Sequence, residues 1–205
     1  MAHHVIATPP DFWHASGAWR RLGRRVGMAF EIERKFLVTS DDWQMGVKSS
    51  CRIRQAYLTS QEKVSVRVRI RDNLAATLTI KSRGAGLRRL ELEYDIPVIE
   101  AEAMLPLRHG AVIEKIRARV PFEGHVWEVD TFLGDNLGMT VAEIELPTVD
   151  HVFTRPPWVG TEVTGQASYY NSALAIFPFN TWASEGCLSS LSDRALELPG
   201  KHRSA

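Results

Sequence analysis

Carboxylates separated by a single residue recur at both ends of the patterned part of this 205-residue chain. Glu31 and Glu33 come near its start, and Glu143 and Glu145 come late. Alternate side chains of a strand share one face of a sheet, so each pair would present two carboxylates side by side. Mg²⁺ and Mn²⁺ prefer oxygen ligands and bind alongside phosphate oxygens. These four glutamates are therefore candidate ligands of such an ion.

Basic side chains show the same alternation in the middle of the chain. Arg67, Arg69 and Arg71 alternate with apolar residues in one segment, and Lys115 and Arg117 lie two apart in a later one. Arginine binds phosphate through two parallel hydrogen bonds, and lysine binds it as a point charge. These rows indicate a surface that binds phosphate groups.

The formal net charge of +1 hides a segregation of charge along the chain. Residues 48–89 contain eleven basic and two acidic residues, whereas residues 90–162 contain fourteen acidic and five basic residues. Two stretches of opposite charge are expected to meet each other, or to enclose something charged.

Two structures are compatible with the alternating charges. The commoner one is an antiparallel sheet with one solvated face. Solvated faces usually mix residue types, however, whereas these segments place like charges at positions i and i+2, where they repel one another. A closed barrel with an inward charged face resolves this conflict, because basic rows can meet a polyanion and acidic rows can hold metal ions.

The dominant hydrophobic period in the chain is two, which is the signal of a strand. We therefore expect a mainly β fold with a few helices (α+β), built as an eight-stranded antiparallel closed barrel. The predicted strands are 30–38, 51–58, 64–71, 76–82, 89–96, 112–120, 125–132 and 140–146. Short helices are predicted at 40–45, 98–109 and 167–177, available to cover the apolar outer faces.

Several classes of protein are excluded or disfavoured. The chain has no P-loop, no zinc signature of paired histidines and no nucleophile-elbow motif. It has no apolar run of about eighteen residues, and its first residues lack the apolar core of a secretory signal, so we expect a cytoplasmic protein with no membrane partner. Residues 1–27 form an Arg-rich extension without strand pattern and 181–205 a C-terminal tail, which leaves 28–180 as the working domain.

A series of short motifs resembles one known family, the CYTH domain of the triphosphate tunnel metalloenzymes. Residues 31–36 match the E-x-E-x-K signature that opens this domain. The later motifs follow in the expected order: Ile53-Arg54-Gln55-Ala56-Tyr57, Val66-Arg67-Val68-Arg69, Leu78-Thr79-Ile80-Lys81, Glu91-Leu92-Glu93-Tyr94, Glu114-Lys115-Ile116-Arg117, Trp127-Glu128-Val129-Asp130, Ala142-Glu143-Ile144-Glu145-Leu146 and Glu162-Val163-Thr164. The resemblance covers about residues 29–177.

The resemblance implies an eight-stranded tunnel that binds a triphosphate together with Mg²⁺ or Mn²⁺. It also implies a role for each matching residue. The implied metal ligands are Glu31, Glu33, Glu143 and Glu145. The implied substrate-binding residues are Lys35, Arg54, Arg67, Arg69, Lys81, Lys115 and Arg117, and among the catalytic candidates are Lys35, Lys81 and Asp130. Further tunnel carboxylates are Glu91, Glu93 and Glu128, and Glu128 and Asp130 could orient water or basic residues. Arg54 alternates with Ile53 and Gln55, so its place on the inner face follows from the resemblance and not from a row of charges.

One departure from the family pattern concerns the last predicted helix. Relatives carry a basic residue or two before the aromatic pair, but this chain has Ala167 and Ser168 before Tyr169 and Tyr170. A phosphate contact from this helix is therefore expected to be missing.

The resemblance implies metal-assisted hydrolysis of a triphosphate, with inorganic tripolyphosphate as the first candidate and orthophosphate as the product. Thiamine triphosphatase and adenylate cyclase activities use the same fold. A rival of another class is a barrel that binds polyphosphate or RNA without catalysis. The fourteen carboxylates of residues 90–162 argue against nucleic acid as the main partner. The sequence does not determine the oligomeric state.

Overall fold

The computed structural model describes residues 29–30, 32–60, 64–82 and 90–182, with the side chains of 29 and 30 left out. Its strands form a single sheet in which every pair is antiparallel. The strands are β1 (Ala29–Phe30), β2 (Ile32–Val38), β3 (Ser49–Ser60), β4 (Val64–Arg71), β5 (Ala75–Ser82), β6 (Leu90–Ile96), β7 (His109–Phe122), β8 (His125–Phe132), β9 (Thr140–Leu146) and β10 (Val159–Glu162). The prediction of a mainly β, antiparallel fold with a few helices is confirmed.

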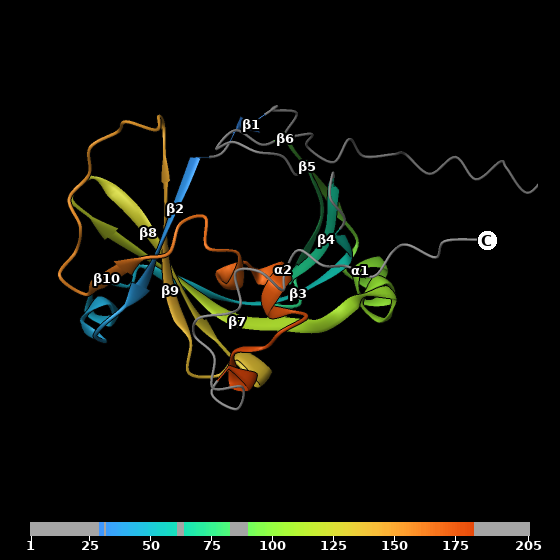
Figure 1. Cartoon of the computed structure of the whole chain (residues 1–205). Coiled ribbons are helices and arrows are strands. Elements are labelled where there is room, and N and C mark those ends of the chain that lie inside the picture. Colours follow the sequence, from blue (N-terminus) through green and yellow to red (C-terminus); the bar gives the residue numbers. More distant parts are fainter. Residues whose placement is uncertain (1–28, 31, 61–63, 83–89, 183–205) are drawn as a thin grey trace, which may run out of the picture.

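The sheet curls, but among the described residues its hydrogen-bonded ladder is not closed, so the closed eight-stranded barrel expected from the sequence is supported only in part. The strand order is β1-β6-β5-β4-β3-β7-β8-β9-β2-β10, with β1 and β10 at the two ends. Only position 31 separates β1 from β2 in the sequence, yet β1 pairs with β6 and β2 pairs with β9. The segment 29–38 therefore touches both sides of the curl (Figure 1), but only two register pairs join it to β6.

A tight turn fixes the register of the β7–β8 hairpin. Glu123 and Gly124 have φ angles of 46° and 78°. Positive φ at both central residues is the mark of a type I′ turn, whose twist matches the twist of the paired strands. Phe122 consequently lies opposite His125, and the same register places Arg117 opposite Asp130.

Two hydrophobic clusters cover the outside of the curl. One is built on Phe36, Trp127 and Ile144, and Trp43 and Trp158 pack over it. The other, which includes Val68 and Ile70 of β4, is covered by Ala101 and Leu105 from α1 (Val98–Met104) and the 3-10 turn η2 (Leu105–Leu107). The predicted helices at 40–45 and 98–109 correspond to η1 (Asp42–Gly46) and to α1 with η2. Both lie outside the curl in Figure 1.

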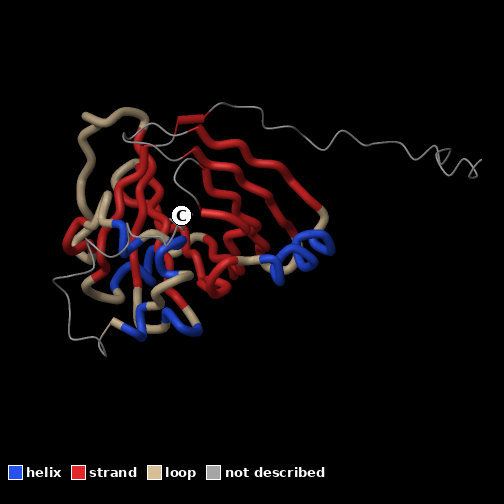
Figure 2. Tube along the Cα trace, turned by 45° about the vertical axis from the view of Figure 1, so that its right-hand side comes forward, coloured by secondary structure: helices blue, strands red, loops and turns tan. Residues whose placement is uncertain are grey.

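A third hydrophobic cluster lies on the inner face, at one end of the curl. Tyr57, Ile113, Phe132 and Val141 belong to it together with Leu174 of α2 (Asn171–Leu174). This cluster shares a face with the charges, because its members lie opposite polar residues of neighbouring strands. The pairs are Tyr57 with Arg67, Ile113 with Gln55, Phe132 with Lys115 and Val141 with Asp130. The last predicted helix, 167–177, is broken into η4 (Ala167–Tyr169) and α2. Figure 2 shows the helical segments gathered toward one end of the strands.

Gly110 permits the close contact between α2 and the start of β7. Its φ is 74°, and a Cβ atom there would lie 2.3 Å from the carbonyl oxygen of Ala175. The next residue, Ala111, donates its N–H to that same oxygen at 2.6 Å. A side chain at position 110 would therefore displace the segment that closes this end of the curl.

Among the described residues, no helix is long and apolar enough to cross a bilayer.

Candidate active site

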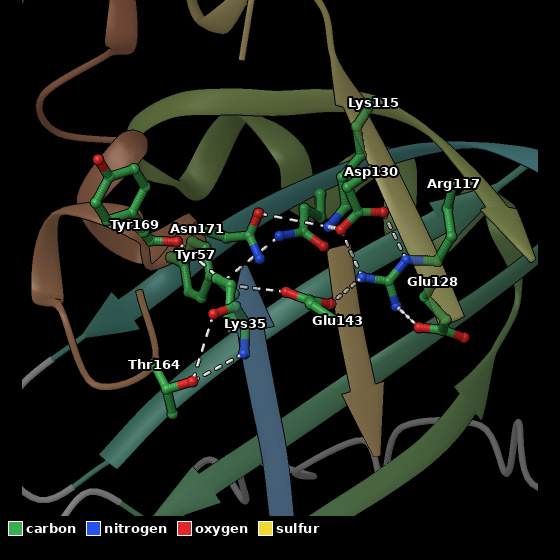
Figure 3. A network of polar contacts seen from close by, with 11 residues as sticks. Lys35, Tyr57, Lys115, Arg117, Glu128, Asp130, Glu143, Thr164, Tyr169 and Asn171 are labelled. Carbon is green, nitrogen blue, oxygen red and sulfur yellow. Dashed lines mark hydrogen bonds and ion pairs between the residues drawn. The ribbon is translucent and has the colours of Figure 1, made fainter. Parts of the chain in front are cut away.

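A network of buried charges joins β2, β7, β8 and β9 (Figure 3). Lys35 contacts Glu143 at 2.8 Å, and Arg117 donates to the other oxygen of Glu143 at 2.6 Å. Arg117 also donates to both oxygens of Asp130, at 2.7 and 2.6 Å, and Lys115 donates to Asp130 at 2.5 Å. We call these five residues the paired cluster. Each of its cations has at least one carboxylate partner.

Strand register explains why these residues meet. Lys35 lies directly opposite Glu143, and Arg117 lies directly opposite Asp130. Glu143 in turn lies opposite Glu128, which also accepts a hydrogen bond from Arg117. Cross-strand partners project from the same face of a sheet, so the alternation of charge in the sequence becomes one continuous patch.

The carboxylates of the paired cluster stay ionised despite their burial. Burial would raise the pKa of Asp130, but Arg117 and Lys115 outweigh it and lower that pKa. Burial would likewise raise the pKa of Glu143, but Lys35 and Arg117 hold it well below its usual value. The same contacts raise the pKa values of Lys35 and Arg117 against the effect of burial.

Lys115 is the exception within the paired cluster. Its side chain is fully buried, and this burial lowers its pKa to about 8 even though it contacts Asp130. Asp130 is shared with Arg117, so its charge offsets only part of the desolvation of Lys115. Lys115 is thus an ammonium whose charge is poorly compensated by the protein alone.

The C-terminal segment supplies contacts that the sequence did not predict. Lys35 donates to the backbone oxygen of Tyr169 at 3.2 Å, and its own N–H donates to Thr164 at 3.0 Å. Lys115 donates to the side-chain oxygen of Asn171 at 3.5 Å. Thr164 was part of a recognised motif, whereas no charge or periodicity distinguishes Asn171.

Of the candidate metal ligands, Glu143 belongs to the paired cluster, and Glu33 and Glu145 lie next to it. Glu33 lies directly opposite Glu145, and Glu143 is two residues from Glu145 on the same strand. Burial, followed by the charge of Glu143, raises the pKa of Glu33 to about 7, although part of its side chain is exposed. The carboxylates of Glu33 and Glu143 repel each other, and a cation bound between them would relieve this repulsion. Glu31 lies outside the described residues.

These carboxylates do not form a complete set of ligands around a metal. They fit Mg²⁺ or Mn²⁺, which can take the remaining ligands from water and phosphate. Within the described ranges, no group of three or more His, Cys, Asp or Glu side chains forms a ready metal site. Mg²⁺ commonly keeps several waters and binds through one or two carboxylates plus the phosphates of a substrate. A partial set of glutamate oxygens is therefore consistent with a metal that arrives with its substrate.

The opposite wall, formed by β3, β4 and β5, is organised differently. Arg69 donates its Nε–H to the side-chain oxygen of Gln55 at 3.1 Å. Arg67 donates to Thr79 at 3.1 Å, while its Nε and the hydroxyl of Thr77 are buried and have no hydrogen-bond partner among the described residues. We call Gln55, Arg67, Arg69 and Thr77 the arginine–glutamine site. Its unsatisfied donors are what a bound anion would complete.

The carboxylates of β6 complete this wall. Glu91 contacts Lys81 at 2.5 Å, and it lies 3.8 Å from Arg67. Glu93 accepts from Thr79 at 3.1 Å and lies 3.8 Å from Arg67. The structure thus places Lys81, Glu91 and Glu93 beside Arg67, as the register of β5 and β6 requires.

Arg54 is the one described candidate that the structure places away from the others. It lies opposite Glu114 and Ile70, on the outer face of the sheet. Its guanidinium bonds Glu102 of α1 and, at 2.9 Å, Asn73. Arg54 therefore fixes α1 to the sheet, which corrects its assignment to the inner face.

Comparison with known proteins identifies the family of this chain. The family model of the CYTH domain matches residues 29–173. The chain is 46% identical to an inorganic triphosphatase of Acetivibrio thermocellus over 76% of this chain and 99% of that protein. It is 37% identical to an inorganic triphosphatase of Nitrosomonas europaea over 71% of this chain and 97% of that protein.

A solved structure of an inorganic triphosphatase is also similar, with a TM-score of 0.55 and 34% sequence identity. The match covers 73% of this chain and 96% of that one. The chain belongs to the CYTH domain family, whose triphosphate tunnel members are metal-dependent enzymes.

Proposed function

We propose that this protein hydrolyses inorganic tripolyphosphate in the cytoplasm and releases orthophosphate, with Mg²⁺ or Mn²⁺ as its cofactor. The observation that carries the proposal is the 46% identity to an inorganic triphosphatase across 99% of that relative's length. The inner face supports it, because rows of cations and carboxylates are what a polyanion that binds together with divalent cations requires.

Divalent metal at Glu31, Glu33, Glu143 and Glu145 would supply Lewis acidity toward phosphate oxygens and water. The chain's own cations would bind the substrate: Lys35, Lys115 and Arg117 on one wall, and Arg67, Arg69 and Lys81 on the other. They would stabilise the charge that spreads over the transferring and leaving phosphates. No Ser or Cys nucleophile is required.

Asp130 has a more specific role in this proposal. Arg117 and Lys115 together contact both of its oxygens, and the carboxylate is fully buried. We infer that it orients these two cations toward the substrate and holds no metal. Lys115, whose pKa is lowered to about 8, would gain a second anionic partner when a phosphate binds.

The test is phosphate release by the full chain from tripolyphosphate, ATP and thiamine triphosphate, with Mg²⁺, with Mn²⁺ and with excess chelator. We expect the largest kcat/KM for tripolyphosphate and no activity in chelator. A higher kcat/KM for thiamine triphosphate, or cyclic AMP formed from ATP, would replace the proposed substrate. Tight binding of tripolyphosphate without phosphate release would identify a non-catalytic binding protein.

A further inference from the structure

Gln55 is an uncharged side chain at the centre of a highly charged face. It lies in the middle of β3, fully buried, directly opposite Arg69 and Ile113. A guanidinium can only donate hydrogen bonds, so the amide oxygen of Gln55 must face Arg69. Its amide nitrogen then points to the hydroxyl of Tyr57, 3.5 Å away. The orientation of the amide is therefore fixed from both sides.

Arg69 differs from the cations around it in having no carboxylate partner among the described residues. Lys35, Lys81 and Arg117 each contact a carboxylate at 2.8 Å or less. Arg69 has only the neutral oxygen of Gln55. Burial, and then the like charges of Arg67 and Arg117, lower its pKa to about 9, so it is still charged at neutral pH. The fold therefore holds a positive charge here that no contacting carboxylate among the described residues neutralises.

The identity of residue 55 determines whether that charge is available. A glutamate would have nearly the same shape as Gln55 and would also accept the Nε–H of Arg69. It would, however, convert Arg69 into an internal ion pair like that of Arg117 with Asp130. An amide holds the guanidinium in place without neutralising it.

We propose that Gln55 is a positioning residue for the triphosphatase reaction, which fixes Arg69 through its Nε edge and keeps its charge available for a phosphate group of the substrate. This inference rests on the proposed function. The terminal nitrogens of Arg69 make no hydrogen bond to any described residue, so phosphate oxygens could occupy both. Arg67 and Thr77, with their unsatisfied donors, belong to the same subsite.

The test compares Gln55→Glu, which keeps the shape and adds a charge, with Gln55→Met, which keeps the length and removes the hydrogen bond. Gln44→Glu is the matched control, because it adds the same charge at an exposed position on η1. We expect Gln55→Glu to raise the KM for tripolyphosphate at least about tenfold, with kcat within about threefold and an unchanged or higher Tm. Gln55→Met should raise KM less and lower Tm, and Gln44→Glu should match the wild type.

A double-mutant cycle with Arg69→Met separates positioning from a general structural effect. If Gln55 acts through Arg69, Gln55→Glu should add nothing to the KM of the Arg69→Met protein. A full further increase in that background would overturn the inference, as would a KM equal to wild type in folded Gln55→Glu. Should Gln55→Glu fail to fold, the same cycle is run with Gln55→Met.

Binding measurements distinguish failure of this inference from failure of the proposed function. Calorimetric titration of each variant with tripolyphosphate in chelator reports on the subsite without requiring turnover. If the wild type releases no phosphate, the proposed function fails, but weaker binding by Gln55→Glu would still support the role of Gln55. If the wild type is active, and Gln55→Glu and Gln55→Met bind tripolyphosphate as tightly as the wild type does, only the inference on Gln55 fails.

Discussion

Arg117 and Arg69 lie on opposite walls of the inner face, and the fold treats their charges in opposite ways. In the paired cluster, Arg117 contacts Asp130 and Glu143, and its pKa is raised well above the usual value. In the arginine–glutamine site, Arg69 contacts an amide and, among the described residues, no carboxylate, and its pKa is lowered to about 9. The guanidinium of Arg117 thus binds carboxylates of the protein, whereas the guanidinium of Arg69 is left available for an anion.

Because of this difference, mutations in the two groups should affect different properties, namely the stability of the fold and the binding of substrate. Removing one member of a buried ion pair leaves its partner uncompensated, which typically costs about 3–5 kcal/mol. Removing a buried charge that has no partner relieves a desolvation cost instead. The paired cluster should therefore matter to the folded state as well as to catalysis, whereas the arginine–glutamine site should matter mainly when substrate is present.

The largest effect is expected from Glu143→Gln, which affects both the metal site and the paired cluster. The change keeps the side-chain volume but removes a charge next to Lys35 and Arg117. We expect metal-dependent phosphate release to fall more than about 100-fold. Mutating residues that only hydrogen-bond to metal ligands already lowers metal affinity or activity about 10–100-fold. Glu114→Gln on the outer face, where Glu114 pairs with Arg52, is the control and should stay near wild type. Wild-type activity in excess chelator would contradict the metal mechanism.

A smaller effect, on pH dependence, is expected from Lys115. Its pKa is about 8 in the folded protein and 10.5 ordinarily, so between these values the unfolded chain binds more protons than the folded chain. The contribution of Lys115 to the free energy of unfolding should therefore rise with pH across this window. The measurement is denaturant unfolding of the wild type and Lys115→Met at pH 7.5 and pH 9.5. The free energy of unfolding of the wild type, relative to that of Lys115→Met, should be higher at pH 9.5 than at pH 7.5. A difference independent of pH would mean that Lys115 keeps an ordinary pKa.

The missing cation of the last helix offers a way to strengthen binding. Ser168 is half-buried in η4, one residue before Tyr169, whose carbonyl accepts from Lys35. Ser168→Arg should add a charged contact to phosphate and lower the KM for tripolyphosphate about tenfold at low salt. Thr148→Arg, which adds the same charge in an exposed loop, should have little effect. An unchanged KM in a folded Ser168→Arg protein would show that position 168 does not reach the substrate.

The smallest effect is expected from removing the two terminal segments. The predicted boundary at 180 omits Trp182, which packs against Tyr169 and Phe179 at one end of the curl. We therefore expect residues 28–182 to fold and keep kcat/KM within about threefold of the full chain, and 28–180 to have a lower Tm. Loss of activity in a folded 28–182 protein would assign a role in catalysis to one of the removed segments.

The sequence predicted the strands well because alternation of polar and apolar residues is a local property. Strand β4, for example, spans Val64–Arg71, which is the range that the alternation predicted. Strand β10 was missed because its four residues, Val159–Glu162, show no alternation and pair with β2 through an irregular register. The gap in the ladder of described residues was not predicted either, because closure depends on how many residues of the first strand pair with β6.

The face of a residue was predictable only where one face is uniformly charged. In β3 the inner face carries Ile53, Gln55 and Tyr57, while the charged Arg54 faces outward to Glu102. The alternation of charged and apolar residues therefore predicts the wrong inner face for β3. The pairing of β3 with β4 shows which residues face inward. Gln55 was part of a recognised motif, but its importance depends on Arg69 lacking a carboxylate partner, which no single segment of sequence can show.

The most direct test of the difference between the two walls is the Tm of wild type, Arg69→Met and Arg117→Met in chelator, each with and without tripolyphosphate. A ligand at free concentration L that binds only the folded state stabilises it by RT ln(1 + L/Kd), so tighter binding gives a larger rise in Tm and one experiment reports both stability and binding. We predict that Arg69→Met has a Tm equal to or above that of the wild type without ligand, but a much smaller increase with ligand. Arg117→Met should be destabilised by about 3–5 kcal/mol even without ligand. Equal destabilisation by both changes, or a wild-type ligand response in Arg69→Met, would contradict the account.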